Sequence, residues 1–189
     1  MQAISPEIIF RGNDAWEEAL PLISRITKSP LILGRSSYTQ KLRKKIFIDL
    51  KDQFLNPDTS DLQFDCCYED ISRVKNLILK DNYDSVIAAG GGKVLDSGKY
   101  ISESLDIPCI TVPLSASTCA GWTALSNIYT KDGQFIKDVT LRSCPKILVY
   151  DHKFIQTAPS RTLASGIADA LAKWYESSIT SSKIDDGLV

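Results

Sequence analysis

Three short segments carry the side chains and backbone best suited to bind a ligand. They are Gly34-Arg35-Ser36, the run Gly90-Gly91-Gly92-Lys93, and a Pro/Ser/Thr-rich stretch at residues 113–118. Consecutive glycines at the start of a helix let backbone N–H groups approach an anion closely, and the helix N-terminus adds a partial positive charge. Lys93 adds a full positive charge. This combination predicts phosphate binding.

Hydroxyl groups in the third segment extend the same chemistry. Ser115, Ser117 and Thr118 can each bind a phosphate, a ribose or an amide group. The simpler alternatives are a tight turn for the glycine run and an ordinary polar loop for the serines. The run from Gly90 matches neither G-x-G-x-x-G nor G-x-x-x-x-G-K-[ST], so the spacing indicates a phosphate-bearing ligand without naming a nucleotide.

The elements that must position these segments alternate between strand and helix. Short β-rich runs at residues 31–33, 63–66, 85–89, 109–112 and 147–150 predict strands, and the spacing at 39–50, 70–80 and 93–105 predicts helices. Such alternation is typical of an α/β fold with an open, mainly parallel, Rossmann-like sheet. We expect all three segments at the carboxyl edge of that sheet, where ligands bind.

Two stretches interrupt this alternation. Residues 126–129 and 134–136 flank the turn signal Lys131-Asp132-Gly133, which predicts a β-hairpin inserted between parallel strands. From Pro159 the sequence becomes helical up to Tyr175, followed by a polar tail at 177–183. We therefore expect an α/β domain over residues 1–156, and over 157–189 the first helix of an all-helical second domain.

Composition restricts the classes of function. With 189 residues, 43% hydrophobic and 24% charged, the chain is typical of a soluble globular protein. The net charge of −1 argues against nucleic-acid or membrane partners, and without a signal peptide or an apolar span the expected location is cytoplasmic. The five cysteines lack C-x-x-C spacing, and the one histidine, His152, restricts metal chemistry.

A longer pattern resembles a known family. It comprises Gly90-Gly91-Gly92-Lys93-Val94-Leu95-Asp96, a stretch from Ser117 to Tyr129, and Gly166-Ile167-Ala168-Asp169-Ala170-Leu171-Ala172-Lys173-Trp174-Tyr175-Glu176. In this order the segments resemble the iron-containing, metal-dependent alcohol dehydrogenases, most closely the glycerol dehydrogenase branch. The resemblance covers only the front half of that family's architecture. It implies reversible hydride transfer between NAD or NADP and an alcohol/carbonyl pair, with zinc or iron(II) polarising the substrate oxygen.

The resemblance also assigns individual residues. It implies cofactor contacts at Gly90, Gly91, Gly92, Lys93, Asp96, Leu114, Ser115, Ser117, Thr123, Leu125 and Tyr129. Asp169 matches the carboxylate that ligates the metal. Helical spacing alone favours a solvated surface position for Asp169, because the apolar stripe of its helix lies on the opposite side; the resemblance instead implies that Asp169 faces the cleft between the domains.

Two positions depart from the glycerol dehydrogenase pattern. Cys119 stands where those enzymes carry an aspartate beside the substrate. A cysteine at this position is similar to the pattern of hydroxycarboxylate dehydrogenase-type members. It indicates a small 2-hydroxy acid as the substrate, as an alternative to a glycerol-like polyol. The simpler alternative is that Cys119 is a small buried thiol with no chemical role. Arg35 stands where NAD-preferring relatives often place Asp. With Ser36 it favours the 2′-phosphate of NADP, the alternative being a surface arginine that borders the site.

Further metal ligands are not evident in the sequence. The family's site needs two histidines from the helical domain, and His152 matches neither, so we expect a chain that is incomplete on its own, weakly active or inactive, and without tightly bound metal. An uncovered apolar face around Leu163, Ile167 and Trp174 would favour a homo-oligomer. The alternatives are a dehydroquinate-synthase-like lyase and a non-catalytic nucleotide-binding or dimerisation fragment.

Overall fold

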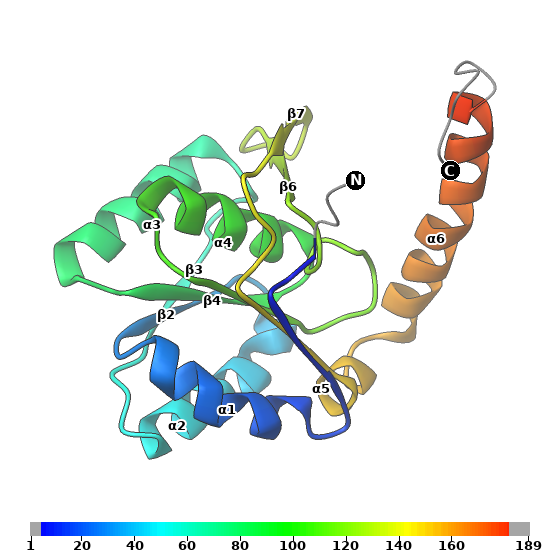
Figure 1. Ribbon diagram of the computed structural model, residues 1–189. Helices are drawn as coiled ribbons and strands as arrows, with labels where there is room; N and C mark the ends of the chain where they lie inside the picture. The colour runs from blue at the N-terminus through cyan, green and yellow to red at the C-terminus, as the bar shows by residue number, and fades with distance from the viewer. Residues whose placement is uncertain (1–4, 182–189) are drawn as a thin grey trace.

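A six-stranded parallel sheet forms the centre of the molecule in the computed structural model, which describes residues 5–181 (Figure 1). Its strands lie in the order β1-β8-β5-β4-β2-β3. Their bounds are β1 Ile8–Gly12, β2 Pro30–Gly34, β3 Asp58–Asp61, β4 Ser85–Gly90, β5 Cys109–Pro113 and β8 Ile147–Asp151. The predicted parallel α/β architecture is confirmed.

Helices cover both faces of the sheet. One face carries α1 (Ala15–Ile26) and α2 (Gln40–Asp52), and the other carries α3 (Tyr68–Asp81) and α4 (Gly92–Leu105). The side chains of the central strands alternate between two cores: Ile32 packs with the α1/α2 side, whereas Leu31 and Leu33 pack with the α3/α4 side. Burial on both faces explains why these strands read as continuous apolar runs.

The predicted strand at residues 63–66 is wrong. The strand β3 lies earlier, at Asp58–Asp61, and residues 62–67 form an irregular connection. β3 is an edge strand whose side chains are mostly exposed, so it carries no apolar signal. The apolar signal came from residues such as Cys66, which is buried in the core from the connection. The first strand and helix, β1 and α1, were not predicted.

The predicted hairpin is confirmed as β6 (Leu125–Tyr129) paired antiparallel with β7 (Phe135–Thr140). It lies beside α4, where the Ser126 hydroxyl donates to the backbone oxygen of Asp96 at 2.9 Å. The Tyr129 amide donates to the backbone oxygen of Cys66 at 2.8 Å. The first bond fixes the hairpin to the N-terminal half of α4, and the second joins it to the connection before α3.

The last part of the described chain is helical. After the short α5 (His152–Gln156), α6 runs from Ser160 to Ser181 and projects away from the sheet (Figure 1). It extends past Tyr175 into the predicted polar tail, of which residues 182 and 183 lie outside the described part. None of the helices in the described chain is long and apolar enough to span a membrane.

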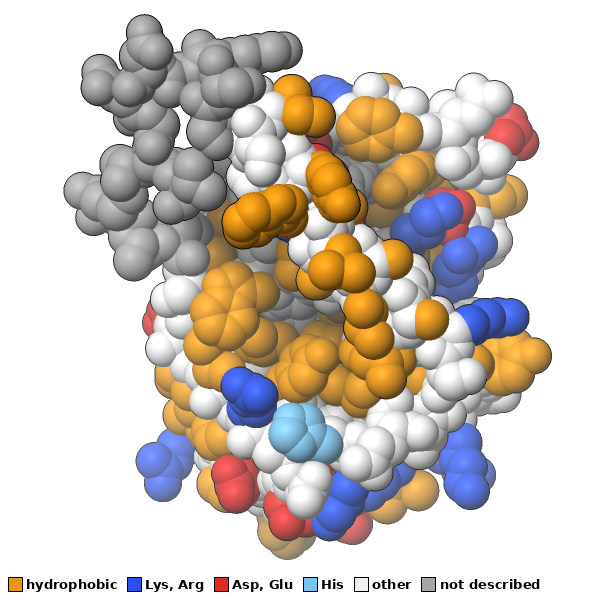
Figure 2. Space-filling model, turned by 90° about the vertical axis from the view of Figure 1, so that its right-hand side faces the viewer, with side chains coloured by type: hydrophobic (Ala, Val, Ile, Leu, Met, Phe, Trp, Pro, Cys, Tyr) orange, Lys and Arg blue, Asp and Glu red, His pale blue; other side chains and the backbone are white. Residues whose placement is uncertain are grey.

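The apolar stripe of α6 faces solvent. Figure 2 shows a band of hydrophobic side chains along it, and its exposed members are Leu163, Ile167, Leu171, Trp174, Tyr175 and Ile179. The opposite side of the helix approaches the loop after β5. A Cβ on Gly166 would overlap the carbonyl oxygen of Ala116, so only glycine permits this approach. The position of α6 is therefore set by a backbone contact, not by its apolar residues.

Candidate functional site

Two of the predicted binding segments meet at the carboxyl ends of β2 and β4. They border a cavity of ≈ 230 Å³ lined by Arg35, Ser36, Thr39, Gly90, Gly91, Gly92, Lys93 and Val94. α4 begins at Gly92, so its first turn and its positive dipole end lie at this cavity. A Cβ on Gly91 would meet only the Ser115 hydroxyl oxygen, at 3.9 Å. The backbone here is open to a ligand, as phosphate binding requires.

Asp65 joins the two cations of this cavity. Its Oδ1 lies 2.7 Å from Nη1 of Arg35, and its Oδ2 forms an ion pair with the Lys93 ammonium. The ammonium also lies 4.7 Å from the centre of the Tyr129 ring, in a cation–π contact. Tyr129 therefore supports Lys93. Asp65 was missed in the sequence because its partners are distant along the chain and it fell within the wrongly predicted strand.

A second cavity, of ≈ 430 Å³, adjoins the first and shares Ser36, Thr39 and Gly91 with it. Ser115 also lines it, and the Ser115 and Ser117 hydroxyl oxygens lie 3.2 Å apart. The Leu114 amide donates to the backbone oxygen of Gly90 at 3.0 Å. This bond holds the third segment against the glycine run, so the three segments converge as the sequence predicted.

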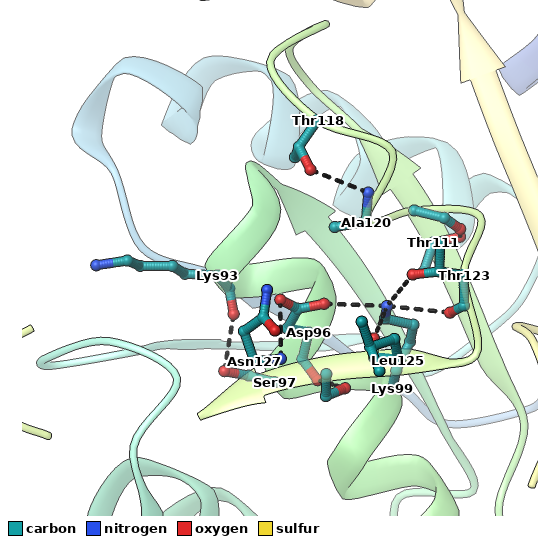
Figure 3. Close-up of polar contacts among 12 residues, drawn as sticks. Lys93, Asp96, Ser97, Lys99, Thr111, Thr118, Ala120, Thr123, Leu125 and Asn127 are labelled. Carbon is teal, nitrogen blue, oxygen red and sulfur yellow. Dashed lines mark hydrogen bonds and ion pairs between the residues drawn. The ribbon is translucent and has the colours of Figure 1, made fainter. Parts of the chain in front are cut away.

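Asp96 has a different environment from the glycine run. Its side chain points away from Lys93 and toward the hairpin (Figure 3), and its Oδ1 lies 3.0 Å from the Lys99 ammonium. Both side chains are almost fully buried, at 7% and 2% exposure for Asp96 and Lys99. Burial raises the pKa of Asp96 even though the Lys99 charge opposes it.

Three further residues bind to this pair, two of them through Lys99. Its ammonium donates to the backbone oxygen and the hydroxyl of Thr123, at 3.1 and 3.2 Å, and to the backbone oxygen of Leu125 (Figure 3). The backbone N–H of Asn127 donates to Oδ2 of Asp96 at 3.3 Å. Asp96, Thr123 and Leu125 thus lie in one polar cluster, built on the buried Asp96–Lys99 pair, that fixes the hairpin outside the two cavities described above. Sequence reasoning missed Lys99.

A third cavity, of ≈ 530 Å³, separates α6 from the loop after β5. Thr118, Cys119, Asp169 and Lys173 contribute to its lining. Cys119 is exposed, and Thr118 accepts a hydrogen bond from the Ala120 amide at 3.2 Å. Asp169 thus borders a cavity instead of open solvent. Helical spacing alone favours a solvated surface position, and the metal-ligand role that the resemblance implies for Asp169 stays a prediction.

The described residues do not complete a metal site. Between residues 5 and 181, no three His, Cys, Asp or Glu side chains are grouped so as to hold a metal ion. The cation Lys173 lines the same cavity as Asp169 and pairs with Glu176 at 2.8 Å. His152 stacks edge-on against Tyr150, with ring centres 6.2 Å apart. One carboxylate beside a lysine does not fit a zinc or iron(II) site on its own.

The cysteines differ sharply in accessibility. Burial raises the pKa of Cys66 and of Cys109 to about 12, and it also raises the pKa of Cys144. Cys67 is buried as well, whereas Cys119 is exposed. Because the thiolate is the reactive form, Cys119 is the most available thiol in the described part of the chain.

Comparison with known proteins places these features in a family. Residues 6–152 match the family model "Iron-containing alcohol dehydrogenase". An uncharacterized oxidoreductase from Synechocystis is 34% identical over 97% of this chain and 47% of its own length. Hydroxycarboxylate dehydrogenase A from Escherichia coli is 38% identical, over 51% of this chain and 26% of its own length.

A solved structure agrees in fold and sequence. A probable glycerol dehydrogenase from Sinorhizobium meliloti superimposes with a TM-score of 0.79 at 25% identity, covering 95% of this chain and 50% of that one. The chain thus spans about half the length of the Synechocystis and Sinorhizobium meliloti proteins.

Proposed function

This chain belongs to the iron-containing alcohol dehydrogenase family, and from that premise we propose that it supplies the cofactor-binding half of an oxidoreductase that interconverts an alcohol and its carbonyl compound. The observation that carries the proposal is the convergence of three loops on two adjoining cavities at the carboxyl edge of the sheet. In open α/β sheets this edge is where dinucleotides bind.

The residues of the cavities fit a nicotinamide dinucleotide. The N-terminus of α4 and the Lys93 ammonium offer partial and full positive charge to a pyrophosphate, and the open backbone at Gly91 permits close approach. Arg35 and Ser36, on the loop after β2, would face the ribose and favour NADP over NAD. When bound, the nicotinamide ring accepts or donates the hydride.

The cavity beside α6 is proposed to receive the substrate. Cys119 lines this cavity in place of a carboxylate, and the cation Lys173 lines it as well, so a small 2-hydroxy acid is accommodated as well as a glycerol-like polyol. Asp169 would supply one metal ligand, and the remaining ligands would come from outside the described residues. We accordingly assign residues 1–156 to the cofactor domain and residues from 157 onward to the beginning of a helical domain.

The proposal is tested by titrating the chain with NADPH and with NADH while following the fluorescence of the reduced nicotinamide. We expect saturable binding of both, tighter for NADPH. Gly91→Ala is the informative variant, because the backbone of Gly91 (φ −86°) accepts an alanine and the added Cβ has room in the free protein. The methyl group projects where the pyrophosphate must approach, so both dissociation constants should rise about tenfold, or about 1.4 kcal/mol.

Ser104→Ala, at the exposed far end of α4, is the matched control and should leave both dissociation constants unchanged. Thermal melting of both variants should resemble that of the wild type. Absence of binding by either dinucleotide to the wild-type chain would refute the proposal.

A further inference from the structure

Asp65 is a nearly buried carboxylate that contacts both cations of the proposed phosphate cavity. We propose that Asp65 acts as an internal anion that offsets the charge of Arg35 and Lys93, and thereby weakens the preference for a 2′-phosphorylated dinucleotide that Arg35 would otherwise impose. The inference rests on the proposed function and assigns Asp65 as a specificity-determining residue of the same site.

The carboxylate is held firmly in place. It is 8% exposed, and one oxygen faces each cation: Oδ1 lies 2.7 Å from Arg35 in an ion pair, and Oδ2 accepts a hydrogen bond from the Lys93 ammonium. The backbone oxygen of Asp65 accepts a hydrogen bond from the Cys67 amide at 2.8 Å. The hairpin turn closes over the group, since a Cβ on Gly133 would lie 3.3 Å from Oδ2. Asp65 is therefore not free to turn away when a ligand enters.

The two cations keep part of their surface for a ligand. The side chains of Arg35 and Lys93 are 44% and 36% exposed, and both line the cavity while Asp65 does not. An anion entering the cavity meets two positive charges already compensated by one negative charge behind them. That compensation matters most for the most highly charged ligand, because each added phosphate charge interacts with the same local potential.

Arg35 is the cation expected to meet a 2′-phosphate, because its planar fork matches phosphate oxygens and it lies on the loop after β2. With the guanidinium in an ion pair with Asp65, less net positive charge remains for that phosphate. NAD, which lacks the 2′-phosphate, depends on the N-terminus of α4 and on Lys93. The carboxylate should therefore reduce NADP binding more than NAD binding.

The alternative role for Asp65 is to position the two cations. If Asp65 served only to orient Arg35 and Lys93, its removal would loosen both cations and weaken both dinucleotides alike. The two roles therefore differ in the sign of the change for NADPH and in the NADH-to-NADPH ratio of dissociation constants.

The experiment compares NADPH and NADH titrations of the wild type, Asp65→Asn, Asp65→Ser and the double variant Asp65→Asn/Arg35→Gln. Both single variants should bind NADPH about tenfold more tightly and NADH only about two- to threefold more tightly at low salt. The gain for NADPH should disappear in the double variant and should shrink at high ionic strength. Asp65→Ser gives a second test if the asparagine variant melts early.

Asp61→Asn is the matched control. Asp61 pairs with Arg43 at 2.8 Å near the same edge of the sheet, but neither residue lines the cavity. The control should leave the ratio of dissociation constants unchanged.

The failures of the two proposals are distinguishable. An unchanged ratio in the Asp65 variants, or weaker binding of both dinucleotides, would overturn the role of Asp65 while leaving the proposed function intact. Absence of binding of NADH and NADPH to the wild type would refute both.

Discussion

Replacing Gly166 by alanine tests the contact that positions α6. The new Cβ would overlap the Ala116 carbonyl oxygen and lie 3.0 Å from its carbonyl carbon and 3.4 Å from Cα of Ser117. Backbone atoms cannot yield as a flexible side chain can, so α6 and the loop must separate by about an ångström, at an overpacking cost of about 1–3 kcal/mol. Asp169, which follows within one turn of α6, would move with the helix.

A second effect has the opposite sign. Alanine is favoured over glycine inside a helix by about 1 kcal/mol, and α6 is largely exposed to solvent, so this gain should be realised fully. The net change in global stability is therefore small, from about zero to a 2 kcal/mol loss. The change in contact between α6 and the loop is the sensitive quantity.

Amide hydrogen exchange resolved by segment measures that contact. We expect faster exchange in the loop at residues 113–122 of Gly166→Ala, by about tenfold for each 1.4 kcal/mol of lost contact. Exchange within α6 should be unchanged or slower. Ser165→Ala, at the exposed neighbouring position, is the control: it adds helix propensity without the overlap, so loop exchange should stay at the wild-type rate.

A stabilised Gly166→Ala variant with unchanged loop exchange would refute the reasoning. It would mean that α6 does not approach Ala116 closely enough for a methyl group to matter, and that Asp169 is positioned in some other way.

Three further predictions concern separate parts of the molecule. Lys99→Met leaves the buried Asp96 without its charge partner, so unfolding by urea should show a loss of about 3–5 kcal/mol at pH 7. Burial already raises the pKa of Asp96, so this loss should become smaller as the pH is lowered and the carboxyl takes up a proton; a loss that does not change with pH would contradict the assignment. Ellman's reagent at pH 8 should react rapidly with one thiol, Cys119, and should react with the other cysteines only when the protein unfolds. A rapid reaction that persists in the Cys119→Ser variant would disprove this prediction. The double variant Ile167→Lys/Leu171→Lys should reduce the self-association that we propose for the exposed stripe of α6, as seen by sedimentation velocity; an unchanged sedimentation coefficient would place any interface elsewhere.

Local signals were sufficient for the central strands, the helices between them and the glycine run. Strands buried on both faces read as apolar runs, and the turn at Lys131-Asp132-Gly133 marked the hairpin. β3 escaped prediction because an edge strand with exposed side chains has no hydrophobic pattern. Because β3 lacks this pattern, the strand was expected at residues 63–66 instead, where the apolar side chains belong to an irregular connection.

Long-range pairing accounts for what the sequence did not disclose about the site. Asp65 and Lys99 look like ordinary charged residues until the fold brings Arg35 to the first and Thr123 to the second. Apolar side chains of a helix usually face the protein, but on α6 the apolar stripe faces solvent and Gly166 faces the protein. Spacing alone therefore favours open solvent for Asp169, whereas in the structure this residue lines the cavity beside α6.

The pairing of β1 with β8 has a consequence for the order of folding. Within the described chain, β1 lies at the edge of the sheet and pairs only with β8, with Ile8 opposite Ile147. The amide of Trp16, at the start of α1, likewise donates to the Asp151 carboxylate at the end of β8. During synthesis, β1 and α1 therefore emerge early but have no native strand partner until about the 150th residue has left the ribosome. We expect this edge to close last, as a slow step of high contact order that follows assembly of β2, β4 and β5.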